Sequence, residues 1–198
     1  MTPATDTNAE WRDGFLFVAN SLSLDFLNTR PTVDGEPMEL LPDNVAFARW
    51  LRAAGLLEGD ELPEWEGTKD RATLLEFREQ LRYAVLRHES GQWIPNAFVT
   101  RLNELLRKHP SCRELVVTED GYARQTVFRP TRLADAFAPI VEDTLNLLTA
   151  DQSKVRKCDG CTVHFLDTSK KGVRRWCSMN LCGNRAKVAA YARRQKQQ

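Results

Sequence analysis

Four of the five cysteines of this 198-residue chain lie close together near its C-terminal end. Two residues separate Cys158 from Cys161, fifteen residues follow, and four residues separate Cys177 from Cys182. A Cys-x-x-Cys turn presents two thiolates to one metal ion, and a second pair completes the tetrahedron that zinc prefers. The spacing therefore predicts one structural Zn²⁺ ion held by Cys158, Cys161, Cys177 and Cys182.

Other uses of these residues are open to the same sequence. Cys158 and Cys161 could form a dithiol redox centre, although such a centre needs neither a second cysteine pair nor basic neighbours. His164 could replace one cysteine as a ligand or bind a transient second metal ion, but with four thiols present we expect it to be a strand residue. The chain has no Ser/His/Asp set, carboxylate pair or glycine-rich phosphate loop, so we expect no enzymatic activity.

Basic residues are concentrated around the cysteines. Residues 151–198 contain 12 Lys/Arg and 3 Asp/Glu, a net charge of +9, whereas residues 1–150 contain 16 and 24, a net charge of −8. A basic tail on an acidic body is typical of proteins that bind nucleic acid or another anionic surface. We predict that double-stranded DNA is contacted by Lys170, Lys171, Arg174, Arg175, Asn184, Arg185, Lys187, Arg193 and Arg194.

A short hairpin and a helix must position these side chains. The sequence predicts strands at 162–166 and 173–176, joined by a polar turn, and a helix from Asn184 onward. On that helix Val188, Tyr191 and Ala192 form an apolar face, which we expect to pack on the zinc core. A cysteine knuckle, a hairpin and a helix together predict a treble-clef-like zinc site, whose metal contributes about 10–16 kcal/mol of folding energy in zinc-finger peptides.

The segment from Cys158 to about Arg194 resembles the CGNR zinc finger, which is named for the tetrapeptide at residues 182–185. The run SLSLDFLNTR, residues 21–30, resembles the opening motif of the ABATE domain. These resemblances imply a bacterial transcription regulator in which the finger binds DNA and the larger domain senses a small molecule or a stress signal. Gly183 would then allow a tight start of the last helix.

The polar residues of the opening motif have two interpretations. In the functional one, a ligand pocket of the larger domain is lined by Asp25, Asn28, Thr29 and Arg30. In the structural one, Asp25 is a buried anchor for backbone amides or an arginine, while Asn28 and Thr29 end a helix.

The rest of the chain predicts an α+β fold with a mostly helical body. We expect a disordered segment at 1–13, an ABATE-like domain at 14–150 and the zinc finger at 151–198. Helices are expected after a cap at Asn20 or Ser21, from Asp43 to Ala54, at 70–88 and from Pro95. A β-hairpin should turn at 119–121, and a last helix should run from 131 to 150, kinked or split at Pro139.

No signal peptide is evident, and the longest apolar run, at 15–19, is too short to cross a membrane. We therefore expect a cytoplasmic protein with no membrane partner, in which thiols stay reduced. One small finger offers few groups that read bases, so DNA specificity could require a homodimer. The alternative functions are a zinc-stabilised protein-interaction module and an RNA-binding protein.

Overall fold

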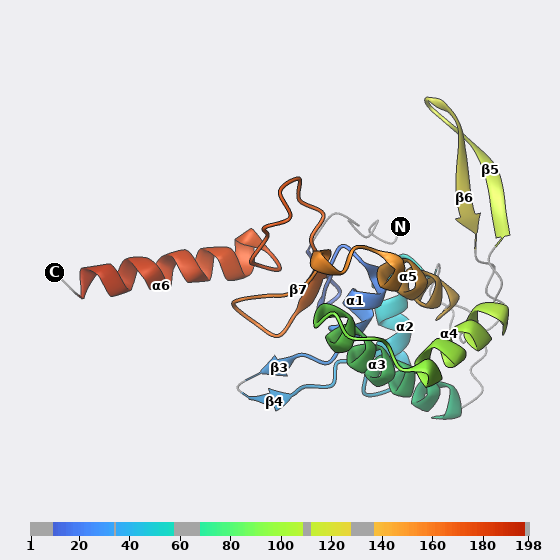
Figure 1. Ribbon diagram of the computed structural model, residues 1–198, viewed down its shortest axis with the longest axis horizontal. Coiled ribbons are helices and arrows are strands. Elements are labelled where there is room, and N and C mark those ends of the chain that lie inside the picture. Colours follow the sequence, from blue (N-terminus) through green and yellow to red (C-terminus); the bar gives the residue numbers. More distant parts are fainter. Residues whose placement is uncertain (1–9, 34, 58–67, 109–111, 128–136, 197–198) are drawn as a thin grey trace.

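A computed structural model describes residues 10–33, 35–57, 68–108, 112–127 and 137–196 (Figure 1). The elements in chain order are β1 (Trp11–Arg12), β2 (Phe15–Leu16), α1 (Leu22–Leu27), β3 (Thr32–Val33), β4 (Glu36–Pro37), α2 (Asn44–Ala53), α3 (Thr68–Glu89), α4 (Asn96–Lys108), β5 (Cys112–Thr118), β6 (Gly121–Val127), α5 (Ala138–Thr149), the 3₁₀ turn η2 (Gln152–Lys154), β7 (Val155–Lys157), β8 (His164–Leu166), the π-helical turn η3 (Met179–Gly183) and α6 (Asn184–Gln195).

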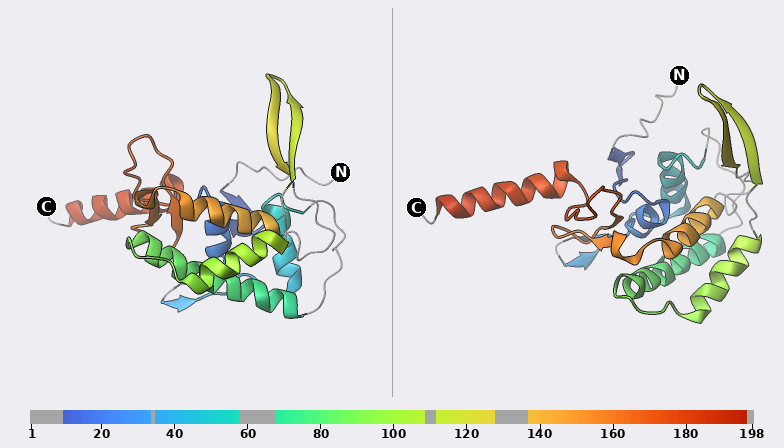
Figure 2. Two further views of the ribbon diagram at one scale, coloured as in Figure 1. Left: turned by 45° about the vertical axis from the view of Figure 1, so that its right-hand side comes forward. Right: turned by 45° about the horizontal axis from the view of Figure 1, so that its top comes forward.

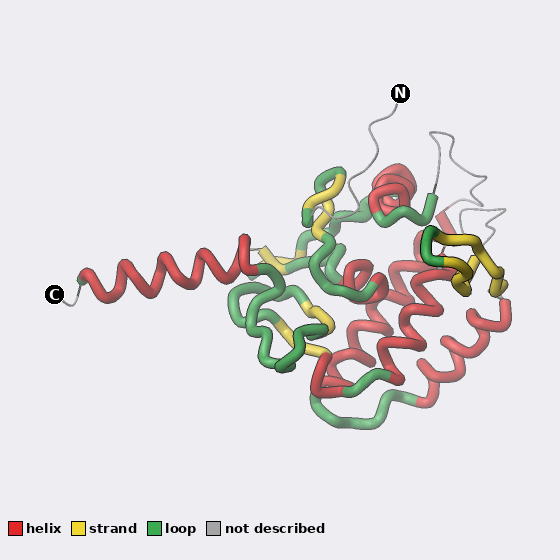
Figure 3. Tube along the Cα trace, turned by 90° about the horizontal axis from the view of Figure 1, so that it is seen from above, coloured by secondary structure: helices red, strands yellow, loops and turns green. Residues whose placement is uncertain are grey.

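Helices form the body, and the described strands pair only as four antiparallel hairpins: β1–β2, β3–β4, β5–β6 and β7–β8. Helix α1 lies at the centre, with α3 and α5 packed against it, as the view from above shows (Figure 3). The predicted α+β class is confirmed. None of the helices in the described ranges has the length and apolar composition needed to cross a bilayer.

An aromatic cluster fills the centre of the body. Phe26 lies 5.5 Å from Trp50 and 5.8 Å from Phe137, measured between ring centres, and Phe77 meets Phe137 edge-on at 4.9 Å. Edge-to-face packing of this kind adds about 0.5–1.5 kcal/mol per pair beyond the area it buries. The same buried cluster continues through Phe165 to the cysteines, so the body and the finger share one core.

Most of the predicted helices are confirmed with their caps. Ser21 is the N-cap of α1, because its hydroxyl accepts from the amide of Leu24, and Asp43 caps α2 in the same way. The face of α4 that periodicity predicted, Phe98, Leu102 and Leu105, is buried. These elements follow local rules of capping and spacing, which is why they could be predicted from the sequence.

The prediction of a disordered segment at 1–13 was wrong for its last residues. Trp11 and Arg12 pair with Leu16 and Phe15, so the ordered chain begins before residue 14; residues 1–9 lie outside the described residues. Pro139 stands in the first turn of α5, where its missing amide hydrogen leaves no helical bond unmade, so it does not kink that helix. The other predicted outcome, a helix split at Pro139, depends on residues outside the described part of the chain. The predicted cap at Thr131 falls outside the described part of the chain.

Two elements project from opposite ends of the body, the β5–β6 hairpin and α6 (Figures 1 and 2). The predicted turn of that hairpin is confirmed, with Thr118 opposite Gly121. Helix α6 buries none of its side chains: Val188 is 69% exposed and Tyr191 is 59% exposed. The expectation that this apolar face packs on the zinc core was therefore wrong, because the helix points away from it.

Candidate metal centre and nucleic-acid interface

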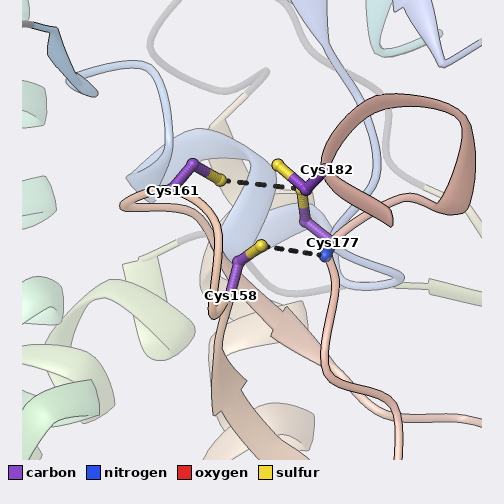
Figure 4. Close-up of side chains that lie close together, drawn as sticks. All are labelled: Cys158, Cys161, Cys177 and Cys182. Carbon is purple, nitrogen blue, oxygen red and sulfur yellow. Dashed lines mark hydrogen bonds between the residues drawn. The ribbon is translucent and has the colours of Figure 1, made fainter. Parts of the chain in front are cut away.

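The four cysteine side chains converge on one point between the body and α6 (Figure 4). Their sulfur atoms all lie within 4.8 Å of one another, and the Sγ of Cys177 is 3.7 Å from those of Cys161 and Cys182. Tetrahedral zinc with Zn–S bonds of 2.3 Å separates its sulfurs by about 3.8 Å. The donor set fits zinc, and its four protein ligands leave no open position for catalysis. The centre is thus a structural site for one zinc ion.

Hydrogen-bond donors surround the sulfurs. The backbone amides of Gly160 and Cys177 point at Cys158 Sγ, at 3.4 and 3.2 Å, and Arg185 Nη2 donates to Cys182 Sγ at 3.0 Å. The hydrogen bond from the Cys177 thiol lowers the pKa of Cys161 to about 5, and donating that bond raises the pKa of Cys177. Neighbouring thiolates repel one another, and a bound dication removes that repulsion.

The hairpin that carries the first cysteine pair differs from the predicted one. β7 pairs with β8, with Lys157 opposite His164, and the Cys158–Cys161 knuckle is the loop between them. Residues 173–176 form no strand. The loop that contains them is held by Asp167, whose carboxylate accepts from the amides of Ser169 and Arg174 at 2.9 and 2.8 Å. Asp167 is fully buried and was not singled out from the sequence.

The outer edge of β8 is held by the segment around α1. Asn28 mimics a neighbouring strand: its Oδ1 accepts from the amide of His164 at 3.0 Å, and its Nδ2 donates to the carbonyl of His164 at 2.9 Å. Two residues further on, the amide of Leu166 donates to the carbonyl of Ala19, and the Asn20 side chain donates to the carbonyl of Leu166. The opening motif therefore joins the body to the finger.

The other residues of the predicted ligand pocket also have protein partners. Asp25 Oδ1 accepts from the amides of Val18 and Ala19 at 3.1 and 3.0 Å, as the structural interpretation expected. The hydroxyl of Thr29 donates to the carbonyl of Phe26, and Arg30 pairs with Glu79 at 3.3 Å. Of the four predicted residues, Asn28 also lines a cleft beside the zinc centre.

A buried arginine that the sequence analysis missed supports this motif. Arg78 is 1% exposed, and its Nη1 donates to Thr29 Oγ1 and to Glu39 Oε1, both at 2.9 Å. It lies beside Phe77 on α3, so the signal was a charge next to the apolar face of a predicted helix. A buried guanidinium needs such partners, because an unpaired buried charge is costly.

Several of the predicted DNA contacts already bind groups of the protein itself. Arg174 donates to the backbone carbonyls of Trp176, Cys177 and Val18, and its guanidinium lies 4.5 Å from the ring centre of Phe165. Arg175 stacks on Trp176 and pairs with Asp159 at 2.7 Å. Arg185 binds Cys182, and Asn184 makes one long bond, at 3.4 Å, to the carbonyl of Asn180.

The remaining five side chains are exposed and make no hydrogen bond or ion pair to a described residue. They are Lys170, Lys171, Lys187, Arg193 and Arg194. The lysines at 170 and 171 lie on the loop after β8, and the other three lie on α6. Lys187 and Arg194 are two helical turns apart, so they share one side of α6 at a spacing of about 10 Å.

His164 lies outside the cysteine cluster, as we expected. It is a residue of β8, 4% exposed, with its Nε2 3.6 Å from Glu89 Oε2. Burial, with the charges of Arg82 and Lys157, lowers the pKa of His164 to about 4. The imidazole is therefore neutral at neutral pH and is part of the contact between α3 and the finger.

A helical body that shares its core with a closed four-cysteine centre defines a zinc protein built from two parts. The comparison with family models gives the same division. The ABATE family, described as "Putative stress-induced transcription regulator", matches residues 20–151, and the CGNR zinc finger matches residues 154–195. The chain belongs to the ABATE family and carries a CGNR zinc finger, which confirms both resemblances. No curated protein gives a significant match.

Proposed function

We propose that this protein is a zinc-dependent, DNA-binding transcription regulator in which α6 enters the major groove. The observation that carries this proposal is the projection of α6, a helix of 12 residues whose ionisable side chains include no acid. A helix of this length extends about 18 Å, and its diameter suits a groove about 12 Å wide. The zinc centre fixes the base of the helix, since Cys182 lies in the turn that leads into it.

The exposed basic residues set the expected contacts. Lys187, Arg193 and Arg194 on α6, with Lys170 and Lys171 on the preceding loop, would neutralise phosphates. Arg174 and Arg185 would instead stabilise the finger that carries this surface, because their guanidinium groups donate to the carbonyl of Trp176 and to Cys182 Sγ. The larger domain would sense a small molecule or stress signal, and its contacts with β8 offer a route by which its state could reach the finger.

The test is the salt dependence of duplex DNA binding by the zinc-loaded protein. The double variant Arg193→Ala with Arg194→Ala should weaken binding and make the log–log salt slope shallower by about 1.8, at about 0.9 per phosphate contact. Its matched control is Arg107→Ala with Lys108→Ala, an exposed basic pair in the last turn of α4. A flat salt dependence, or an equal effect of the two variants, would refute the proposal.

A second candidate function is recognition of a protein partner, and the exposed Val188 and Tyr191 favour it. These apolar side chains lie between the basic ones on α6 and could dock on an acidic protein surface. A complex that survives nuclease treatment, with no duplex binding, would support this function. Competition between duplex DNA and structured RNA separates DNA from RNA as the nucleic-acid partner.

A further inference from the structure

A cleft of about 510 Å³ lies between the N-terminal hairpins and the zinc centre. One wall comes from β1, β2 and β3, and the other comes from the cysteine knuckle, η3 and the start of α6. The volume is within the range of about 300–1,000 Å³ that is typical of small-molecule sites. The two walls are joined beside it by a hydrogen bond from the amide of Thr32 to Thr162 Oγ1, at 3.1 Å. The cleft therefore spans the contact between body and finger.

Apolar side chains form most of the cleft. Trp11 and Val33 are exposed to solvent within it, and Leu16 and Leu181 line it from opposite walls. Covering such surface releases water and stabilises a complex by about 25 cal/mol per Å² of apolar area. The indole of Trp11 adds a flat face, which favours a planar aromatic ligand over a branched aliphatic one.

One charged group lines the cleft. Arg185 carries the only side-chain cation among the lining residues. Its Nη2 is fixed by the carbonyl of Gly160 at 3.3 Å and by Cys182 Sγ at 3.0 Å, while Nε and Nη1 have no acceptor in the described part of the chain. These donors suit a single oxygen acceptor. A carboxylate usually binds two parallel N–H groups on one edge of a guanidinium, and each such edge includes Nη2. Because both hydrogens of Nη2 are engaged, Arg185 cannot bind a carboxylate in this way.

The charge of the zinc centre decides between a neutral and an anionic acceptor. Three of the lining residues are the cysteines 161, 177 and 182. Four thiolates on one Zn²⁺ carry a net charge of about −2, which Arg185 only partly offsets. A carboxylate placed here would be repelled, whereas a neutral carbonyl oxygen would accept from Arg185 without that repulsion.

We propose that this cleft binds a neutral, planar aromatic molecule with one carbonyl oxygen, its rings against Trp11 and Val33 and its oxygen at Arg185. A bound ligand would contact both walls of the cleft and so hold the finger against the N-terminal hairpins. This would change how freely α6 moves relative to the body. This site gives the sensing part of the proposed function a location and rests on that function for its biological role. The cleft itself is tested without DNA, so its failure and that of DNA binding are distinguishable.

The probes are 1-naphthamide and 1-naphthoate, titrated calorimetrically into the full-length, zinc-loaded protein. We expect one 1-naphthamide per chain and at least tenfold weaker binding of 1-naphthoate. Val33→Trp fills the cleft and should weaken 1-naphthamide at least tenfold with unchanged zinc stoichiometry. Its matched control, Val99→Trp on α4, starts from a similar exposure, 41% against 43%, and should leave the affinity unchanged.

Three results would overturn the assignment. The first is no binding of 1-naphthamide, and the second is equal affinity for the amide and the carboxylate. The third is an affinity that Val33→Trp and Val99→Trp leave equally unchanged, which would place the ligand elsewhere. Arg185→Met is a further test of the acceptor: it should remove the preference for the amide over 1-methylnaphthalene, with zinc stoichiometry measured on the same sample.

Discussion

Replacing Asn28 with alanine should loosen the finger from the body. The Asn28 side chain makes both hydrogen bonds to the backbone of His164, at 3.0 and 2.9 Å, and His164 is 4% exposed. Alanine leaves that amide and carbonyl without their partner, and an unsatisfied buried group costs about 1–3 kcal/mol. Asn28 also borders the cleft, where water can enter, so we take the lower half of that range, about 1–2 kcal/mol for each of the two groups. The free energy of unfolding of the zinc-loaded protein should fall by about 2–4 kcal/mol.

Urea unfolding followed by tryptophan fluorescence measures this loss. With a urea dependence of about 2 kcal/mol per molar, the midpoint should drop by about 1–2 M. The matched control is Asn103→Ala, because Asn103 is exposed on α4 and makes no side-chain hydrogen bond to a described residue. Its effect should stay within about 0.5 kcal/mol. If the two variants unfold at the same urea concentration, the Asn28–His164 pair contributes no net stability and the reasoning is refuted.

Four further substitutions test other parts of the structure. Burial raises the pKa of Asp25 to about 7, so its contribution to stability is fully present below about pH 4 and is lost as the pH rises through 7. Asp25→Asn should abolish this pH dependence, at most about 4 kcal/mol, in unfolding curves measured from pH 4 to 8. Arg174→Ala, which removes three bonds to backbone carbonyls, should cost about 2–4 kcal/mol, whereas the exposed Arg175→Ala should cost less than about 1 kcal/mol in the same unfolding assay. Gly183→Ala should stay within about 1 kcal/mol in thermal unfolding, because only the flexible, half-exposed Met179 must move and the helix gains propensity.

The motif that contains Gly183 was identified correctly, but the role predicted for this glycine was wrong. We expected the glycine to allow a tight start of α6, yet its φ is −63°, a value that any residue adopts in a helix. A Cβ at this position would lie 2.8 Å from Met179 Sδ, and glycine avoids that contact. Motif recognition located the residue, but only the packed structure shows the atom it accommodates.

Local patterns were sufficient for the metal centre and for most of the helices. The cysteine spacing identified the four ligands, because a knuckle and a returning pair are defined within 25 residues of sequence. Caps at Ser21 and Asp43 depend on side chains within three residues of the amides they accept from. Such contacts are short-range, so the sequence alone carries their signal.

Contacts between distant segments could not be predicted in the same way. Asn28 and His164 are 136 residues apart, and nothing near either of them indicates that an amide side chain extends a strand. The strand partner of β8 was also misplaced, because β7 is a basic, three-residue segment with only Val155 buried. Whether α6 packs against the body likewise depends on contacts with distant segments, and the spacing of its own apolar residues does not reveal them.

Zinc loading and the stability of the body should be linked, because the cysteines share the core with Phe165 and α1 holds the edge of β8. A ligand that binds only the native state, at 1,000 times its dissociation constant, stabilises that state by about 4 kcal/mol. If the finger were an independent appendage, chelation would affect residues 154–195 alone. In this fold, chelation should also speed amide hydrogen exchange in α1 and in the part of α3 that contacts β7, while α4, which is remote from the finger, provides the internal control. Unchanged exchange in α1 after chelation would show that the shared core does not couple the two parts.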